Sequence, residues 1–155
     1  MPNERHLLID GPNAIHASRD LDSLARRDRD AARRRLSELA WTIRDQGGWR
    51  VTVVFDGRGE TLTSEYAAGD EGCWVIYTPN GVTADDVIER LVGRSENPER
   101  CRVVSADRAV QSTVAAAGAE VMPPADFFSW VARAEEQLSR RRLAQNGKEA
   151  AKWRA

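Results

Sequence analysis

The sequence predicts an α/β fold in which helices cover a mainly parallel central sheet within a single domain. Three observations support this prediction. Short apolar and β-branched runs alternate with longer stretches of helical period, which is the pattern of repeated βα units. The 155 residues are enough for one domain with one core. The sequence contains no internal repeat and no linker that would divide it.

Five strands are expected. Residues 7–10 form the first strand, and residues 51–55 form an unbroken apolar run, typical of a strand that is covered on both faces. Further strands are expected over residues 74–77, 102–105 and 119–122. Because helical stretches separate most of these runs, the strands are expected to lie mainly parallel.

Four helices are expected to complete the fold. Residues 28–46 carry an apolar stripe at helical spacing, and the pair Gly47-Gly48 ends this helix. The other helices are expected over residues 84–92, 108–116 and 125–144. Helices of this length between strands are those of an α/β sandwich.

Two segments are expected to lack regular structure. Residues 57–72 contain four glycines and no clear period, which predicts a mobile loop. Residues 146–155 are predicted to form a polar C-terminal tail, so that the domain proper covers residues 1–145.

The composition is that of a soluble globular protein, with 41% hydrophobic and 30% charged residues. No apolar run approaches the roughly 20 residues that a membrane span requires, and the N-terminus lacks the order of a secretory signal. Cys73 and Cys101 do not have the spacing of a disulfide framework or a thiolate metal site. We therefore expect a cytoplasmic protein with reduced thiols.

The net charge of -1 conceals an uneven distribution. Basic residues outnumber acidic ones by 10 to 8 in residues 1–50 and by 7 to 3 in residues 133–155, whereas residues 51–132 contain 6 basic and 13 acidic residues. An acidic middle between basic flanks suits a metal site whose surroundings hold a polyanion. Ordinary solvated helix faces are an equally good interpretation.

The feature most relevant to function is a set of acidic residues that follow successive strands. Asp10 closes the first strand, Asp85 and Asp86 come after the third, and Asp107 comes after the fourth. Because the carboxyl ends of parallel strands share one edge of the sheet, these side chains are expected to be neighbours. Crowded carboxylates repel one another unless a cation neutralises them. Hard oxygen ligands favour Mg²⁺ or Mn²⁺ over Zn²⁺, so we expect a site for one of these two ions.

Asn13 belongs to the same constellation because it lies three residues after Asp10. Its amide could position a phosphate oxygen or a metal-bound water, since it offers both a donor and an acceptor. The segment from Asp10 to Asn13 also has a purely structural interpretation, because Asp, Gly, Pro and Asn are common turn residues.

The other acidic residues have structural interpretations as well. Thr83 and Asp86 have the spacing of a capping box, and Asp107 could cap the helix that follows it. Capping explains each position singly, but it explains less well why acidic residues recur at the same topological place. Asp56 and Glu89 are supporting candidates for the same site.

Two basic clusters could contact RNA phosphates or could be solvated helix faces. Arg33 and Arg34 belong to the arginine-rich stretch 26–35, and Arg140 and Arg141 lie late in the last expected helix. Three tryptophans are candidates for base stacking, although core packing is the favoured interpretation: Trp49, Trp130 and Trp153.

Other enzyme signatures are missing. The sequence has no phosphate-binding loop of the P-loop type, no dinucleotide-binding glycine motif and no nucleophile elbow. Pro12 stands where the second aspartate of a haloacid-dehalogenase-type Asp-x-Asp motif would be. His16 lies near the first βα unit, but carboxylate–metal hydrolysis does not need a histidine base, and a surface or core role is favoured.

Several segments match, in order, those of a known family. Residues 7–17 resemble an opening motif in which a hydrophobic run is followed by Asp-Gly-Tyr-Asn-x-Ile. The segments that continue the match are 53–56, 75–78, 83–91 and 103–107. In these segments, over about residues 6–140, the chain resembles the YacP-like NYN domain proteins. Pro12 departs from the family pattern because it replaces the tyrosine, which stiffens the turn and removes an aromatic ring.

The resemblance implies a Rossmann-like sandwich of the PIN/NYN type and an Mg²⁺- or Mn²⁺-dependent endoribonuclease. It places metal ligands at Asp10, Asp85, Asp86 and Asp107, and a supporting amide at Asn13. The implied partners are RNA, either single-stranded RNA or mRNA, and the ribosome. Two other functions stay open. One is a non-catalytic module that binds RNA or the ribosome, and the other is a small-molecule phosphoesterase.

Overall fold

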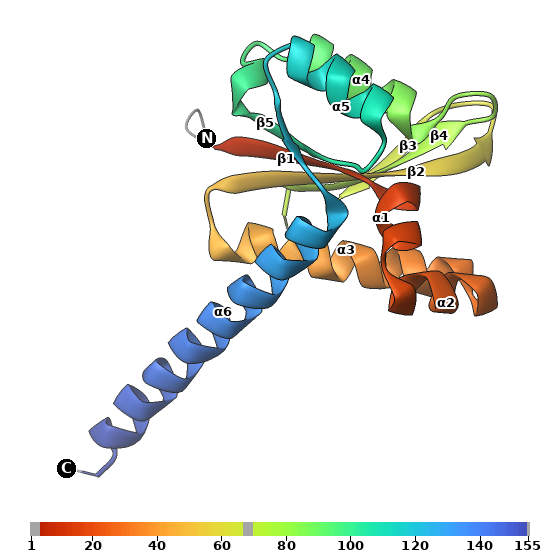
Figure 1. Cartoon of the computed structure of the whole chain (residues 1–155). Coiled ribbons are helices and arrows are strands. Elements are labelled where there is room, and N and C mark those ends of the chain that lie inside the picture. Colours follow the sequence, from red (N-terminus) through yellow and green to blue (C-terminus); the bar gives the residue numbers. More distant parts are fainter. Residues whose placement is uncertain (1–3, 67–69, 155) are drawn as a thin grey trace.

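The structure is a computed structural model that describes residues 4–66 and 70–154. A six-stranded sheet forms its centre, with the strand order β3-β4-β2-β1-β5-β6 (Figure 1). Within the described residues, every strand pair is parallel except β3 with β4. This arrangement confirms the predicted α/β fold with a mainly parallel sheet.

All five expected strands are present, with ends that differ by a few residues from the expected ones. The strands are β1 (Arg5–Asp10), β2 (Trp49–Gly59), β3 (Thr63–Tyr66), β4 (Cys73–Pro79), β5 (Cys101–Val104) and β6 (Glu120–Met122). The helices are α1 (Gly11–Ala17), α2 (Arg19–Arg27), α3 (Arg29–Gln46), α4 (Ala84–Gly93), α5 (Arg108–Ala116) and α6 (Pro124–Lys152), with a short 3₁₀ turn η1 (Pro98–Arg100).

The helices cover both faces of the sheet. Helices α1, α2, α3 and the first part of α6 lie on one face, and α4 and α5 lie on the other (Figure 1). Strand β1 shows how the sequence supplies both cores: Leu7 and Ile9 face α3, whereas Leu8 faces α4. All three are fully buried. An uninterrupted apolar run is therefore required in this strand, because neither of its faces meets water.

The segment 57–72 is not the loop that its glycine content predicts. Strand β2 continues to Gly59, and Thr63–Tyr66 forms β3, which pairs antiparallel with β4. Residues 67–69 lie outside the described part of the chain. Every residue of β3 is exposed, so this edge strand has no alternation of buried and exposed positions. Its backbone hydrogen bonds to β4 define it, and a hydrophobicity pattern does not reveal such a strand.

Two helices occupy residues that were expected to form turns or connections. Asp10 caps α1 by accepting a hydrogen bond from the Asn13 amide at 3.3 Å, and Pro12 occupies the first turn, where its missing N–H has no cost. A Cβ at Gly11 would lie 2.7 Å from the Val54 carbonyl oxygen, so glycine lets α1 begin close to β2. Ser18 caps α2 in the same manner as Asp10 caps α1.

Helix α6 is longer than expected, because it continues to Lys152 instead of ending near residue 144. Phe127, Val131 and Ala134 are buried at helical spacing, whereas residues 139–154 are all exposed. The second half therefore projects away from the body of the molecule (Figure 1). Its alanine, glutamine, lysine and arginine content favours a helix without tertiary contacts. In the described part of the chain, no helix combines the length and the apolar character that crossing a membrane requires.

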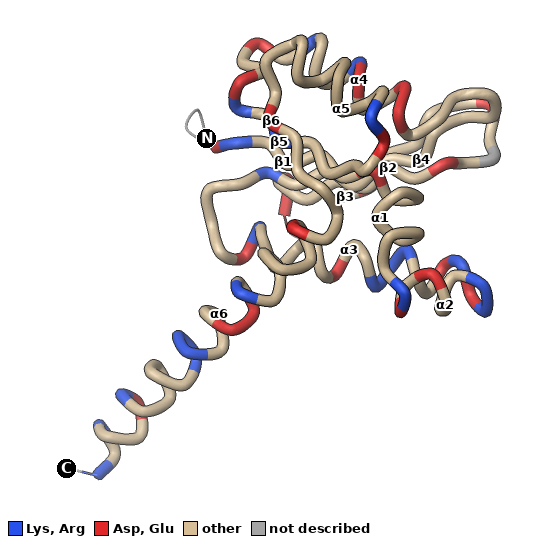
Figure 2. Tube along the Cα trace, in the orientation of Figure 1, with Lys and Arg blue, Asp and Glu red and all other residues tan. Residues whose placement is uncertain are grey.

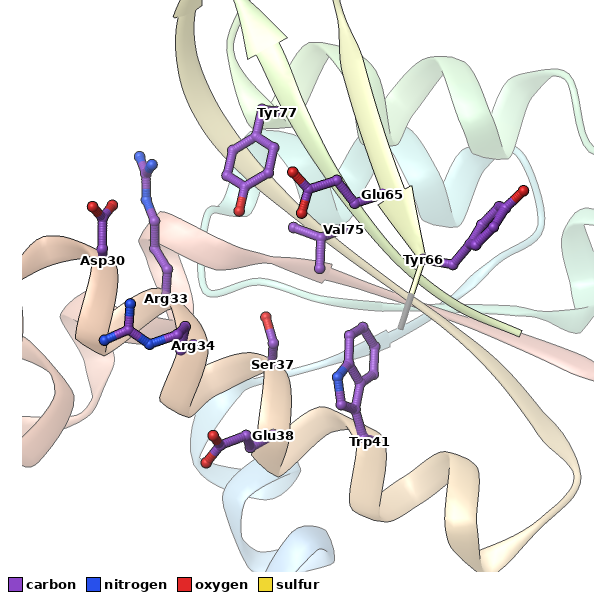
Figure 3. Close-up of a pocket in the computed structure, with 10 residues that line it drawn as sticks. All are labelled: Asp30, Arg33, Arg34, Ser37, Glu38, Trp41, Glu65, Tyr66, Val75 and Tyr77. Carbon is purple, nitrogen blue, oxygen red and sulfur yellow. The ribbon is translucent and has the colours of Figure 1, made fainter. Parts of the chain in front are cut away.

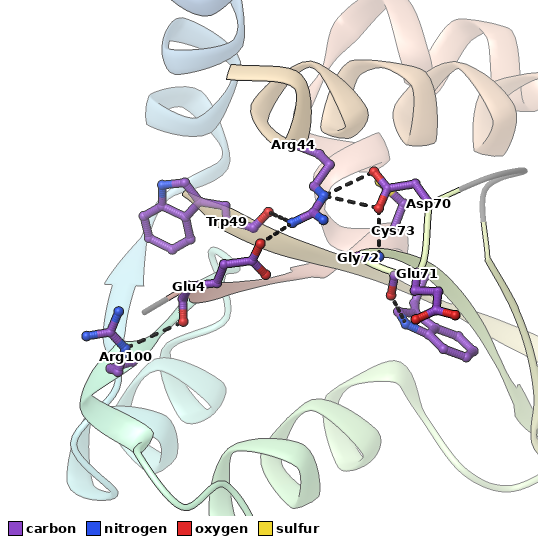
Figure 4. A network of polar contacts seen from close by, with 9 residues as sticks. Glu4, Arg44, Trp49, Asp70, Glu71, Gly72, Cys73 and Arg100 are labelled. Atoms are coloured by element: carbon purple, nitrogen blue, oxygen red, sulfur yellow. Dashed lines mark hydrogen bonds and ion pairs between the residues drawn. The ribbon is translucent and has the colours of Figure 1, made fainter. Parts of the chain in front are cut away.

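Arg44 joins several elements at the amino-terminal edge of the sheet (Figure 4). Its Nη1 donates to Glu4 Oε1 and to the Trp49 carbonyl oxygen, both at 2.9 Å, and its Nε lies 3.0 Å from Asp70 Oδ2. The Asp70 carboxylate also accepts a hydrogen bond from the Gly72 amide at 2.8 Å. The hydrogen bond that Arg44 donates to Asp70, together with the two negative charges, holds the pKa of Arg44 above its ordinary value. One guanidinium thus connects α3 to the starts of β1, β2 and β4.

Replacing Arg44 by methionine should lower the free energy of unfolding by about 1–3 kcal/mol, because Glu4 and Asp70 would keep their charges without a partner. Urea unfolding followed by circular dichroism measures this change. Arg35→Met is the matched control, since Arg35 forms an exposed pair with Glu38 at 3.6 Å that should contribute less than about 1 kcal/mol. Equal stability losses in the two variants would contradict the connecting role of Arg44.

Candidate acidic site

Acidic side chains converge at the carboxyl-terminal edge of the sheet. Asp10 is the last residue of β1 and is only 3% exposed. Asp56 lies near the carboxyl end of the neighbouring strand β2, and Asp85 lies in the first turn of α4, which follows β4. Parallel pairing places these segments side by side, as expected for the carboxyl ends of parallel strands.

The pKa of Asp10 reflects this crowding. Burial raises it most, and a hydrogen bond with the Asp85 carboxyl, the charge of Asp85 and the charge of Asp56 raise it further, to about 8. The hydrogen bond from the Asn13 amide has the opposite, weaker effect. In the absence of a cation, Asp10 therefore keeps a proton at neutral pH. A cation bound beside Asp10 would stabilise its ionised form and so lower its pKa.

Asp56 also positions the helix that carries Asp85. Its Oδ1 accepts a hydrogen bond from the Ala84 amide at 2.9 Å, at the beginning of α4. Its carbonyl oxygen accepts a hydrogen bond from Arg33 Nη2 at 2.8 Å. Asp56 was only a supporting candidate in the sequence, and the structure shows that it connects β2, α3 and α4 next to Asp10.

Ser105 lies on the other side of Asp10 and is fully buried. Its Oγ donates to Asp10 Oδ2 at 3.4 Å and accepts from the Asp107 amide at 3.1 Å. Asn13 joins the same loop, because its Oδ1 accepts a hydrogen bond from the Ala106 amide at 2.8 Å. Sequence reasoning did not identify Ser105. The available signal was a small polar residue placed directly after a buried strand, at the edge where the acids gather.

Asp86 and Asp107 act as helix caps in this structure. Asp86 Oδ2 accepts a hydrogen bond from the Thr83 amide at 3.1 Å, which completes a capping box, and this bond lowers the pKa of Asp86. Asp107 Oδ1 accepts from the Ala109 amide at 2.8 Å. Both carboxylates use one oxygen for capping. Asp85 interacts directly with Asp10, whereas Asp107 is linked to Asp10 by its backbone amide, which donates to the Ser105 hydroxyl.

The donors at this edge suit a hard cation, although they do not form a complete cage. No group of three or more His, Cys, Asp or Glu side chains in residues 4–66 and 70–154 is arranged to hold a metal ion. Asp10 and Asp85 nevertheless offer two adjacent carboxylates, and Asp56 adds negative charge beside them. Mg²⁺ is commonly held by one or two carboxylates together with water and substrate phosphates. The pair fits an ion of that kind.

The two predicted RNA-binding clusters lie in different parts of the molecule. Arg33 and Arg34 are on α3, and Arg33 contacts Asp56 at the acidic edge. Arg140 and Arg141 are on the projecting half of α6, where basic residues recur along the helix (Figure 2). Arg140 pairs with Glu136 at 2.6 Å. One cluster thus adjoins the candidate site, whereas the other lies outside the globular body.

The tryptophans and histidines have mainly structural positions. Trp49 and Trp130 pack edge to face with ring centroids 5.2 Å apart, so the structure supports packing for these two and not base stacking. Trp153 is 87% exposed at the end of α6. His16 is exposed, and its Nδ1 lies 3.5 Å from a carboxylate oxygen of Asp22 in α2, which is not one of the residues predicted for the metal site.

Comparison with known proteins agrees with this architecture. A family model, the YacP-like NYN domain, matches residues 7–155. The crystal structure of Rae1 (YacP) from Bacillus subtilis is similar, with 26% sequence identity and a TM-score of 0.74, over 94% of this chain and 83% of that one. A crystal structure of a mutant of that protein gives the same identity and TM-score, over 91% and 84% of the two chains. A comparison with curated proteins found no match.

The raised pKa of Asp10 predicts how stability depends on pH in metal-free buffer. The folded protein keeps the Asp10 proton up to about pH 8, whereas the unfolded chain loses it near pH 3.8. The contribution of Asp10 to the free energy of unfolding is therefore fully present below pH 3.8 and is lost as the pH rises through 8. We compare the free energy of unfolding of Asp10→Asn with that of the wild type. The difference in favour of the variant should be about 2–5 kcal/mol larger at pH 9 than at pH 4.

Urea unfolding in EDTA at both pH values measures this difference, and titrating groups that do not interact with Asp10 cancel between variant and wild type. Asp20→Asn, at an exposed position in α2, is the control and should follow the wild-type pH dependence. If the Asp10→Asn and wild-type curves remain parallel from pH 4 to pH 9, Asp10 does not carry the proton.

Proposed function

Because the chain belongs to the YacP-like NYN domain family, which has a PIN-like nuclease fold, we propose that it is a metal-dependent endoribonuclease that cleaves single-stranded RNA. The family relation supports a nuclease-like hydrolase acting on RNA. The cation and the particular RNA are the parts that this proposal adds. The observation that supports the cation is the buried Asp10 carboxyl beside Asp85.

Asp10 and Asp85 would hold Mg²⁺ or Mn²⁺, with Asp86 and Asp107 contributing through the carboxylate oxygens that are not engaged in capping. When bound, such an ion supplies an activated water and neutralises charge on the phosphate. Asn13 fixes the loop after β5 against α1 through its hydrogen bond to the Ala106 amide. This contact keeps the acids in register across the two strands.

Ser105 and Asp56 support the same pair from two sides. Ser105 donates its hydroxyl hydrogen to Asp10, which orients the carboxyl toward the edge. Asp56 fixes the start of α4 and with it the position of Asp85. Preorganised groups of this kind act without rearrangement when charge develops on the reacting phosphate.

The RNA backbone would be held by arginines at two distances from the acids. Arg33 and Arg34 lie on α3 beside the acidic edge, whereas Arg140 and Arg141 lie on the projecting part of α6. The second pair could reach a bound particle larger than a short oligonucleotide. We therefore propose that the substrates include mRNA on the ribosome.

A second candidate is a non-catalytic RNA- or ribosome-binding module. The observation in its favour is that the described residues contain no group of three ligands arranged for a metal ion. Such a module should bind RNA equally well with EDTA and with Mn²⁺, and it should leave the RNA intact.

Asp10→Asn and Asp85→Asn should each reduce cleavage of single-stranded RNA by about 100-fold or more, because removal of one carboxylate weakens the hold on the cation. Denaturing gels of end-labelled RNA, with Mg²⁺, Mn²⁺ or EDTA, measure the rate. Asp20→Asn is the matched control and should cut at the wild-type rate. Cleavage at the wild-type rate by either site variant would overturn the assignment, and uncut RNA in every arm would favour the binding module.

The double variant Arg140→Gln/Arg141→Gln should bind long RNA less tightly at low salt, because two phosphate contacts are lost. The slope of log affinity against log salt concentration should decrease by about 1–2. Filter binding between 50 and 300 mM KCl is a suitable measurement. Arg94→Gln, at an exposed position after α4, is the control. An unchanged slope in the double variant would remove α6 from the RNA-binding surface.

A further inference from the structure

A hollow of about 390 Å³ lies between α3 and the outer strands β3 and β4 (Figure 3). Trp41 from α3 and Tyr77 from β4 lie at opposite ends of it, and Val75 lies between them on the sheet. Polar side chains also line it: Ser37, Glu65, Asp30, Arg33, Arg34 and Glu38. Its volume is within the range of small-ligand sites, which are commonly about 300–1,000 Å³.

Arg33 links this hollow to the acidic edge. Its guanidinium lies 5.3 Å from the Phe55 ring centroid and 5.8 Å from that of Tyr77, and it donates a hydrogen bond to the Asp56 carbonyl oxygen. Arg33 also lines an adjoining hollow together with Asp56 and Gly57. A chain that passes Asp56 can therefore enter the hollow directly beside the Arg33 cation.

The lining has the chemistry that an unpaired nucleobase requires. Trp41 offers aromatic surface for stacking, Tyr77 offers the part of its ring that does not stack on Phe55, and Val75 adds an apolar surface. Among the described residues, the Glu65 carboxylate and the hydroxyls of Ser37 and Tyr77 form no hydrogen bond with other side chains or backbone groups. The charge of Glu65 acts on the Tyr77 hydroxyl and, after burial, is the next largest cause of its raised pKa.

We propose that this hollow is a base-binding subsite for single-stranded RNA and that Glu65 makes it selective for guanine. This inference rests on the proposed ribonuclease function, since the base would belong to a nucleotide near the cleaved phosphate. Arg33 would contact the phosphate between the subsite and the acids. Unpaired RNA bases are commonly recognised in this way, by stacking together with hydrogen bonds to the Watson–Crick edge.

Guanine is the base that matches a carboxylate. Its Watson–Crick edge presents two adjacent donors, N1–H and N2–H, which both oxygens of Glu65 can accept, and the O6 acceptor can take a hydrogen bond from Ser37 or Tyr77. Adenine presents one donor beside one acceptor, cytosine presents one donor beside two acceptors, and uracil presents one donor between two acceptors. Each of these bases would leave a carboxylate oxygen opposite an acceptor or without a partner.

Mononucleotide binding tests the subsite separately from cleavage. With the whole protein in EDTA, we expect GMP to shift the Trp41 indole signal in ¹⁵N NMR spectra at concentrations about tenfold lower than IMP, AMP, CMP or UMP. IMP is the informative comparison, because it differs from GMP only by the missing N2 amino group. Trp41→Phe assigns the indole signal.

Glu65→Gln should abolish the preference of GMP over IMP and improve the relative binding of AMP, because an amide offers one donor and one acceptor. Glu135→Gln, an exposed substitution on α6 with the same charge change, should keep the preference for GMP. The ratio of affinities is the readout, so a general gain in anion binding does not affect the result. Equal binding of GMP and IMP by the wild type, or an unchanged ratio in Glu65→Gln, would overturn the proposal.

The two proposals can fail separately. If the wild type cuts RNA with Mn²⁺ but GMP leaves the Trp41 signal unchanged, the base subsite is wrong and the nuclease function stands. If GMP is preferred over IMP through Glu65 but no RNA is cut with Mg²⁺ or Mn²⁺, the subsite stands and the catalytic function is wrong.

Discussion

The pairing of the central strand β1 with parallel neighbours on both sides is the constraint on which the structure depends. Strand β1 is hydrogen-bonded to β2 and β5, and its apolar side chains enter both cores. Because of this pairing, Asp10 at the end of β1 lies at the carboxyl-terminal edge of the sheet, between β2 and β5. The acids therefore meet because the strands are parallel, although their charges oppose the arrangement. At the opposite edge of the sheet, the charges attract one another, because Arg44 pairs with Glu4 and Asp70.

Much of the fold could be predicted from the sequence because its strands are buried. Val53 and Val54 face opposite cores, so an unbroken apolar run was a reliable signal for β2. Strand β3 gave no such signal, because its side chains are exposed and only its backbone bonds to β4 define it. Helix α1 was missed because Asp10 and Pro12 favour a turn as much as a helix start.

The sequence predicted only part of the residues at the acidic edge, and it did not predict their roles. Asp10 and Asp85 were expected to be neighbours, and their electrostatic interaction agrees with that expectation. Whether an aspartate caps a helix or faces another carboxylate depends on side-chain orientation, which the position in the chain does not determine. Asp86 and Asp107 cap helices here. Asp56 accepts a hydrogen bond from the Ala84 amide at the start of α4, and Ser105 donates one to Asp10. Contacts between distant segments define these last two.

Arg33 takes part both in the packing of the domain and in the surface beside the acids. Its guanidinium covers the rings of Phe55 and Tyr77 and bonds to the backbone of β2. A substitution at this position would therefore alter thermal stability and substrate preference together. An evolutionary or engineered change toward one of these properties would encounter a trade-off with the other. Compensating substitutions are then to be sought in β2 and β4, where the partners of Arg33 can be repacked.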